Sequence, residues 1–218
     1  MAHTPDPNSK HEAYRLALAS VANAKAAPQR PASATPYAEL VCCTNFSFLR
    51  GASHAEELVR RAVELGLSAL AITDWHSLAG VVRAHEAARE YGLKLLIGTR
   101  VQLREGLELC LYAMNRKGYG NLCRLLTLGK RRADKGECDL SMIDVQEFSS
   151  DLQAVLLPGP DTTAAQIAPL LPLFPGRLSV AIMRHLDGGQ ESRLKAACAL
   201  AEAVSLPVIA VNDVHFHD

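Results

Sequence analysis

The sequence predicts an α/β fold in which a mostly parallel sheet of about seven strands closes into a barrel. Two observations predict this fold class. From residue 37 onward, short apolar runs alternate with segments of helical periodicity. The helical segments are about 10–15 residues long, the length that right-handed βαβ units need. At about seven strands we favour closure over an open sheet, although periodicity alone leaves both open.

Strands are predicted where short apolar runs are bounded by polar or turn residues. Run 69–73 stops at Asp74, which is typical of a buried parallel strand. Glu105 and Gly106 mark the turn of a hairpin. The predicted strands span residues 38–43, 69–73, 93–97, 101–103 with 107–113, 153–157, 178–182 and 208–211.

Helices are predicted where apolar residues recur at helical spacing and a glycine follows. Leu58, Ala62 and Leu65 share one face of the first predicted helix. Ser77 is expected to cap the second helix, and Gly92 to end it. The predicted helices span residues 55–66, 78–91, 118–132, 163–171 and 190–204.

Composition divides the chain and excludes several classes of protein. We expect residues 1–36 to form a flexible extension rich in alanine and proline, and residues 37–218 to form the domain. The 23 basic residues balance the 23 acidic ones, so net charge predicts neither nucleic-acid nor membrane binding. An aromatic content of 5% argues against a stacking platform for single strands. Six cysteines without a CxxC pair or a secretory signal indicate reduced thiols and a cytoplasmic location.

Polar residues follow several predicted strands, at the edge where parallel α/β folds place functional groups. Asp74 and His76 follow the second strand, and Arg100 follows the third. Asp213 and His215 follow the last strand. Because side chains alternate along a strand, Asp213 and His215 share a face and could hold one metal ion. The same spacing also fits structural hydrogen bonding, so both roles stay open.

Five segments form a series in register: YAELVCCTNFSFLRGAS, LAITDWHSLAGVVRAHEAA, LKLLIGTRVQL, AMNRKGYGNLCRLLTLGKRR and LPVIAVNDVHFHD. In order and spacing they resemble the PHP (polymerase and histidinol phosphatase) domain at the amino end of bacterial C-family DNA polymerase alpha subunits. The first two segments are most similar to the error-prone, damage-inducible paralogue. The resemblance covers about residues 37–218.

The resemblance implies a distorted seven-stranded (βα) barrel of PHP type with a trinuclear metal centre at the strand ends. Such a centre hydrolyses phosphoesters, in some members as a 3′–5′ proofreading nuclease. Its ions need several His and carboxylate ligands and lower the pKa of a bound water. In this chain the corresponding pocket would be formed by Val41, Cys43, Arg50, Asp74, Trp75, Arg100, Glu108, Asp213 and His215.

Only the last pair of this pocket matches the family's ligands outright. A valine and a tryptophan replace histidines, and two arginines bring permanent positive charge to carboxylate positions. We therefore expect no metal ion, no cofactor and no catalytic residue here. Arg50 and Arg100 should instead be the counter-ions of Asp74 and Asp213. Cys43 could be a zinc thiolate, although a lone buried cysteine is more often a small apolar residue.

Two other functions stay open. A rebuilt zinc or manganese site would make the domain a phosphoesterase or 3′–5′ exonuclease; its ligands would be Asp74, His76, Asp213, His215 and His217. Alternatively, His76 and His217 are surface histidines. Segment 116–135 carries seven basic residues and one acid, so it could contact DNA, dock on a partner or be a solvated helix face. Its candidate contacts are Arg116, Lys117, Arg124, Lys130, Arg131 and Arg132.

Together these observations predict the amino-terminal PHP domain of an error-prone polymerase that copies damaged DNA. We expect the domain itself to be a catalytically inactive structural or interaction module, because most of the family's metal ligands are replaced. We expect it to lack polymerase activity on its own, because 218 residues leave no room for a polymerase palm and fingers. Expected partners are the remainder of the polymerase chain, DNA bound through that polymerase, and accessory damage-response proteins. We expect no membrane association and a monomeric domain.

Overall fold

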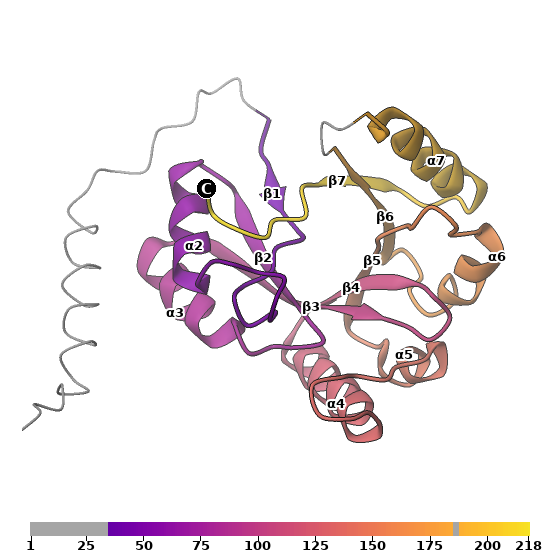
Figure 1. The fold of residues 1–218 in the computed structure, drawn as a ribbon, viewed down its shortest axis with the longest axis horizontal. Coiled ribbons are helices and arrows are strands. Elements are labelled where there is room, and N and C mark those ends of the chain that lie inside the picture. Colours follow the sequence, from indigo (N-terminus) through magenta and orange to yellow (C-terminus); the bar gives the residue numbers. More distant parts are fainter. Residues whose placement is uncertain (1–34, 185–187) are drawn as a thin grey trace, which may run out of the picture.

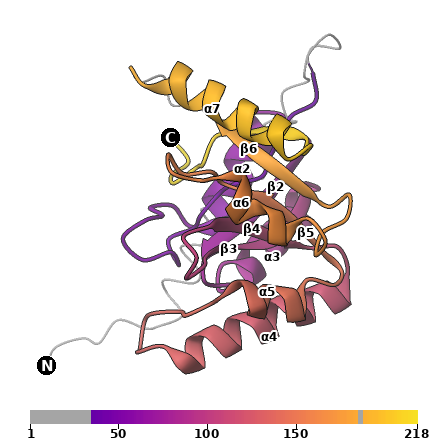
Figure 2. The same ribbon diagram turned by 90° about the vertical axis from the view of Figure 1, so that its right-hand side faces the viewer.

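The structure is a computed structural model that describes residues 35–184 and 188–218. Nearly all of the predicted extension, residues 1–36, lies outside the described residues. The described chain forms a seven-stranded sheet that curves into a distorted barrel, and the helices lie on its outer side (Figures 1 and 2). This confirms the predicted fold class.

The strands pair in the order in which they occur along the chain. All neighbours are parallel except β4, which is antiparallel to both β3 and β5. The predicted hairpin is therefore present. The strands are β1 (Ala38–Glu39), β2 (Ala69–Trp75), β3 (Lys94–Gln102), β4 (Glu108–Ala113), β5 (Leu152–Leu156), β6 (Leu178–Met183) and β7 (Val208–Val211).

The helices surround the strands as an incomplete outer ring (Figure 1). Within the described residues, no helix is both long and apolar enough to cross a bilayer. The helical elements are α2 (Ala55–Glu64), α3 (Val81–Tyr91), α4 (Arg116–Arg132), α5 (Met142–Phe148), α6 (Ala164–Ile167), the 3-10 turn η1 (Ala168–Leu170) and α7 (Gln190–Ala203).

Some predicted boundaries were wrong. The first strand was predicted over 38–43 but pairs regularly for only two residues. The third was predicted to end at residue 97, yet β3 continues through Gly98 because both neighbouring strands pair with it there. Ser77 does not cap α3 directly; its hydroxyl accepts a hydrogen bond from the Ala79 N–H (3.1 Å), and the helix begins at Val81. Gly92 ends α3 in the left-handed conformation (φ 67°), as predicted.

Helix α5 was not predicted. Ser141 begins it through a capping box with Asp144. The Asp144 carboxylate also accepts two hydrogen bonds from the guanidinium of Arg132, at 2.6 and 2.8 Å. A helix of seven residues is too short to be stable on its own, so contacts with α4 are needed to stabilise α5.

Apolar side chains fill both sides of the curved sheet. Two clusters lie between the strands and the helices, with Leu70 and Ile72 of β2 in one and Leu109 of β4 in the other. A third cluster contains Ala71 and Cys110, the alternate residues of the same two strands. Since side chains alternate along a strand, this third cluster fills the barrel interior.

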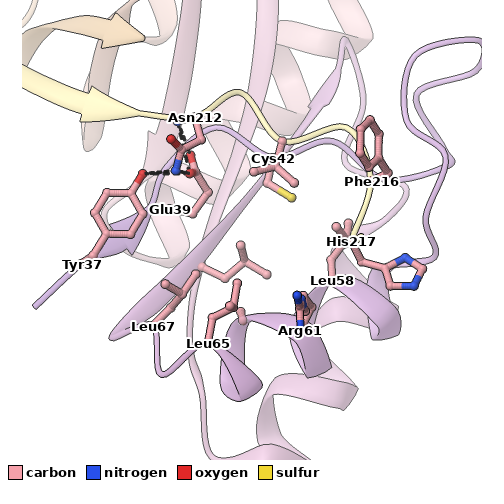
Figure 3. Close-up of a pocket in the computed structure, with 13 residues that line it drawn as sticks. Tyr37, Glu39, Cys42, Leu58, Arg61, Leu65, Leu67, Asn212, Phe216 and His217 are labelled. Atoms are coloured by element: carbon pink, nitrogen blue, oxygen red, sulfur yellow. Dashed lines mark hydrogen bonds between the residues drawn. The ribbon is translucent and has the colours of Figure 1, made fainter. Parts of the chain in front are cut away.

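The barrel closes through side chains more than through strand pairing. Among the described residues, the segment after β1 and the segment after β7 are joined by an isolated bridge, Cys42 to Val214. Beside it, the buried carboxylate of Glu39 accepts hydrogen bonds from the Tyr37 hydroxyl (2.8 Å) and from the Asn212 side chain (3.0 Å), as Figure 3 shows. It also accepts from the Val41 N–H (2.9 Å). Glu39 thus joins the two edges of the sheet.

We predict that Glu39→Ala lowers the free energy of unfolding by about 2–3 kcal/mol, because several buried donors lose their acceptor. Glu39→Gln retains one acceptor oxygen and should lose less. Chemical denaturation of the whole chain measures both, with Glu64→Ala on the exposed side of α2 as the control. Equal stability of Glu39→Ala and the control would show that the Glu39 carboxylate does not hold the barrel closed.

Candidate functional site

The inward side chains of neighbouring strands meet at the mouth, by which we mean the carboxyl-terminal end of the parallel strands. Trp75 of β2 is the register partner of Arg100 of β3, and Arg100 is the partner of Cys110 of β4. Because Cys110 belongs to the inner cluster, Trp75 and Arg100 also face inward. Glu108 lies two residues from Cys110 and is therefore a diagonal neighbour of Arg100 on the same face.

Arg100 is the centre of an ion-pair cluster. Its Nη1 donates to Asp213 Oδ1 at 2.6 Å, and its Nε and Nη2 both contact Glu108 Oε1. The side chains of Arg100, Glu108 and Asp213 are 11, 20 and 13% exposed. One guanidinium therefore neutralises two carboxylates that are largely shielded from water.

Burial and charge act against each other in this cluster. Burial alone would lower the pKa of Arg100, but the carboxylates of Glu108 and Asp213 outweigh it, and the pKa is raised. Burial raises the pKa of Glu108, although the neighbouring guanidinium favours its ionised form. Arg100 is therefore a permanent cation between the two carboxylates.

A second arginine covers the indole ring beside this cluster. The guanidinium carbon of Arg50 lies 3.7 Å from the centroid of the Trp75 ring, and that of Arg100 lies 4.5 Å from it. Both are cation–π distances. The indole N–H of Trp75 is buried and has no hydrogen-bond acceptor among the described residues. We call Arg50, Trp75, Arg100, Glu108 and Asp213 the mouth cluster.

Asp74 does not belong to the mouth cluster, so half of the predicted counter-ion arrangement was wrong. Its carboxylate faces outward, is fully buried, and accepts hydrogen bonds from the Thr44 N–H (2.7 Å), the Thr44 hydroxyl (2.9 and 3.0 Å) and the Ser47 hydroxyl (2.6 Å). Arg50 instead stacks on Trp75. Sequence analysis missed Thr44 and Ser47, although a polar run directly after a strand is a signal for such a role.

Three other residues of the predicted pocket lie at the mouth or inside the barrel beneath it: Cys43, His215 and Val41. Val41 packs in the inner cluster. Cys43 is buried, and its Sγ lies 3.5 Å from His215 Nδ1. Burial, then the charges of Asp74 and Asp213, raise the pKa of Cys43 to about 11, so its sulfur is a neutral thiol at pH 7. His215 Nε2 lies 3.4 Å from Asp213 Oδ1.

The five ligands of the rebuilt metal site do not converge. His76 Nε2 accepts a hydrogen bond from the Gln102 N–H (3.0 Å), and burial lowers the pKa of its ring. The Nδ1 of His217 is 2.7 Å from the Ser53 hydroxyl, and His217 lines an apolar pocket of about 370 Å³ between α2 and the C-terminal segment (Figure 3). Only Asp213 and His215 are in contact. Within residues 35–184 and 188–218, no three His, Cys, Asp or Glu side chains form a group that could hold a metal ion.

The donor set at the mouth therefore does not fit the metal centre that this fold carries elsewhere. An inward Val and Trp supply no lone pair for coordination, and the Arg100 guanidinium binds one oxygen of each acidic side chain, Glu108 Oε1 and Asp213 Oδ1. Divalent ions require such oxygens to be free. We assign no chemical step to a metal in this domain.

The predicted basic contacts all lie on α4 and are exposed. They are not equally available. Arg132 is bound to Asp144, Lys117 Nζ lies 3.2 Å from Asp151, and Arg124 donates to Asn121 (3.4 Å). Within the described part of the chain, Arg116, Lys130 and Arg131 have no carboxylate at ion-pair distance. This leaves an exposed helix face with positive charge and no acidic residue on the helix itself.

Comparison of the fold identifies the class of protein. A solved structure from Bifidobacterium adolescentis, assigned as a metal-dependent phosphoesterase, superposes with a TM-score of 0.62 at 16% identity, covering 86% of this chain and 89% of that one. An amidohydrolase from Chromobacterium violaceum, solved with bound sulfate and no metal, gives 0.57 at 16% identity over 82 and 87%. The fold is thus that of PHP-type phosphoesterases and amidohydrolases.

Sequence comparison then gives the family. The PHP domain profile matches residues 39–179, and the chain belongs to the PHP domain family. It is 46% identical to an error-prone DNA polymerase of Dechloromonas aromatica and 48% identical to one of Pseudomonas paraeruginosa, in each case over 83% of this chain. The chain spans 18% of the length of these relatives.

We predict that Arg100→Met lowers the free energy of unfolding by about 3 kcal/mol at pH 8, because two shielded carboxylates lose their common cation. Burial raises the pKa of Glu108, and without the opposing charge of Arg100 that pKa rises further above its unfolded value, so the folded state binds a proton more tightly. The loss should therefore be smaller at pH 5 than at pH 8.

Urea denaturation at the two pH values tests this, with Arg104→Met as the matched control. Arg104 pairs with Asp139 on the surface, where solvent screens the interaction. The double variant Arg100→Met with Glu108→Gln should recover part of the stability. A loss that is independent of pH, or no larger than that of the control, would contradict the ion-pair interpretation.

Proposed function

We propose that this chain is the PHP domain of an error-prone DNA polymerase that acts in damage-induced translesion synthesis, and that the domain is a metal-free structural and interaction module without hydrolytic activity. The observation that carries the proposal is the Arg100 guanidinium bound to both Glu108 and Asp213. The relatives named error-prone DNA polymerase support the assignment to such a polymerase.

The mouth cluster explains why the domain would not cut phosphodiesters. Hydrolysis in this fold class needs a positioned water with a lowered pKa, and metal ions normally provide it. Here the acidic oxygens are neutralised by an arginine, which does not take up or release a proton at neutral pH. Of the described titratable groups at the mouth, the Cys43 thiol is protonated and His215 is in contact with Asp213.

The same cluster supports a structural role. It joins β2, β3, β4 and the segment after β7 across the mouth through charge-assisted hydrogen bonds and cation–π contacts. We propose that this rigid barrel supports the remainder of the polymerase chain in the cytoplasm and that accessory damage-response proteins bind the assembled polymerase.

A second role is favoured by the exposed basic face of α4, which would contact DNA held by the polymerase, or dock on the polymerase body. Lys117, Arg124 and Arg131 are spaced seven residues apart and so lie close to one line along the helix. A line of cations is the electrostatic pattern that follows a phosphate backbone.

The metal content of the purified chain tests the main proposal. We expect elemental analysis to find zinc, manganese and iron far below one ion per chain, and no phosphodiesterase activity above that of Asp213→Ala, with or without added Mn²⁺. Stoichiometric metal that is lost together with hydrolysis in Asp213→Ala would contradict the proposal and establish a nuclease or phosphoesterase.

The role of α4 is tested by the binding of primed DNA at several salt concentrations. Arg131→Gln should weaken binding and reduce the slope of log affinity against log salt by about 0.9, the value expected for one lost contact to a duplex phosphate. Thr127→Ala, which changes an exposed uncharged residue of the same helix, should leave the slope unchanged. Identical slopes for Arg131→Gln and the unsubstituted chain would exclude Arg131 as a phosphate contact.

A further inference from the structure

A pocket of about 460 Å³ lies beside the mouth cluster, between the loop that follows β1 and the C-terminal end of α4. This volume is within the usual range for small-molecule sites and is enough for one nucleotide. The side chains that matter for its chemistry are Phe46, Phe48, Arg50, Trp75, His76 and Lys130.

Two uncompensated cations line this pocket. Within the described part of the chain, neither Arg50 nor Lys130 has a carboxylate at ion-pair distance. Both positive charges act on the same side chain. Burial lowers the pKa of His76, and the charges of Lys130 and Arg50 lower it further. Glu137 is the acidic side chain among the described lining residues, so the lining carries a net positive charge.

Aromatic rings are concentrated around these cations. Three of the chain's aromatic residues (five Phe, five Tyr and one Trp) line this one pocket. Arg50 covers the ring of Trp75, but Phe46 is 43% and Phe48 is 82% exposed. Exposed rings next to unpaired cations are the combination by which proteins hold single strands, with bases stacked on rings and phosphates held by cations.

We propose that this pocket binds a segment of single-stranded DNA, with one phosphate contacted by Arg50, the neighbouring phosphate contacted by Lys130 and the base between them stacked on Phe48. The choice of DNA as the ligand rests on the proposed function. The inference extends that function, because the domain would hold a DNA strand without cutting it. Each strand phosphate carries one negative charge. Two cations partly offset by Glu137 suit two such groups better than a free nucleoside triphosphate, whose charge is about fourfold that of a strand phosphate.

Trp75 provides the measurement, because it is the chain's one tryptophan and it lines the pocket. A short oligothymidylate is titrated into the whole chain in EDTA while tryptophan fluorescence is recorded, at several salt concentrations. We expect a saturable change in fluorescence. The slope of log affinity against log salt should be about −1.4, which corresponds to two contacts with single-strand phosphates.

Substitutions separate the two parts of the site. Lys130→Gln should halve the slope to about −0.7, since one phosphate contact is lost. Phe48→Ala should weaken binding about tenfold and leave the slope unchanged, because stacking is not ionic. Lys195→Gln, an exposed lysine on α7, is the matched control and should behave like the unsubstituted chain. Circular dichroism confirms that each variant is folded.

Four outcomes would overturn the inference. They are no saturable change with DNA in EDTA, a slope near zero, Lys130→Gln behaving like the control, and deoxythymidine triphosphate binding as tightly as the oligonucleotide. A slope near zero together with loss of binding in Phe48→Ala would show that the oligonucleotide binds by base stacking alone, without the proposed phosphate contacts. Binding that appears only with added Mn²⁺ would overturn both this inference and the metal-free proposal. No binding in a chain shown to lack metal would overturn this inference alone.

Discussion

The guanidinium of Arg100 lies where two inward-facing carboxylates and an indole ring meet, and the arrangement of the mouth depends on it. Glu108 begins β4, the middle strand of the sheet, and Asp213 follows β7 at one edge. The two carboxylates would repel each other if no cation lay between them. In this barrel, the positive charge of the Arg100 side chain offsets that repulsion. A covalently attached cation cannot exchange with solvent, so the mouth is assembled whenever the chain is folded.

In our proposal, the ion pairs hold the strands together at the mouth but support no metal-dependent reaction there. A metal centre at the same edge would leave coordination positions open for water and phosphate. In the mouth cluster, Arg100 instead binds one oxygen of each carboxylate and Arg50 stacks on Trp75. The neighbouring pocket remains accessible. There, the loop after β1 and the end of α4 place aromatic side chains next to basic ones. In our proposal, this pocket binds a polyanion that the mouth does not hydrolyse.

Much of the fold could be predicted because the signals are local. The alternation of apolar runs with helical periodicity, the Glu105 and Gly106 turn and the Gly92 stop depend on a few neighbouring residues. Helix α5 could not be predicted, because a tertiary contact with Arg132 stabilises it. At the site, the pairing of Arg100 with Asp213 followed from charge and from the family's pattern. The hydrogen bonding of Asp74 was not predicted, because strand alternation points its side chain outward, toward Thr44 and Ser47. A low overall aromatic content likewise hid the local concentration around Phe48.

Anomalous X-ray diffraction from crystals soaked in Mn²⁺ or Zn²⁺ tests the central claim most directly, since it locates metal and guanidinium in one experiment. The account predicts no anomalous peak at the mouth and Arg100 hydrogen-bonded to both Glu108 and Asp213. A strong peak within coordination distance of Asp213 and His215, with the Arg100 side chain displaced, would contradict it.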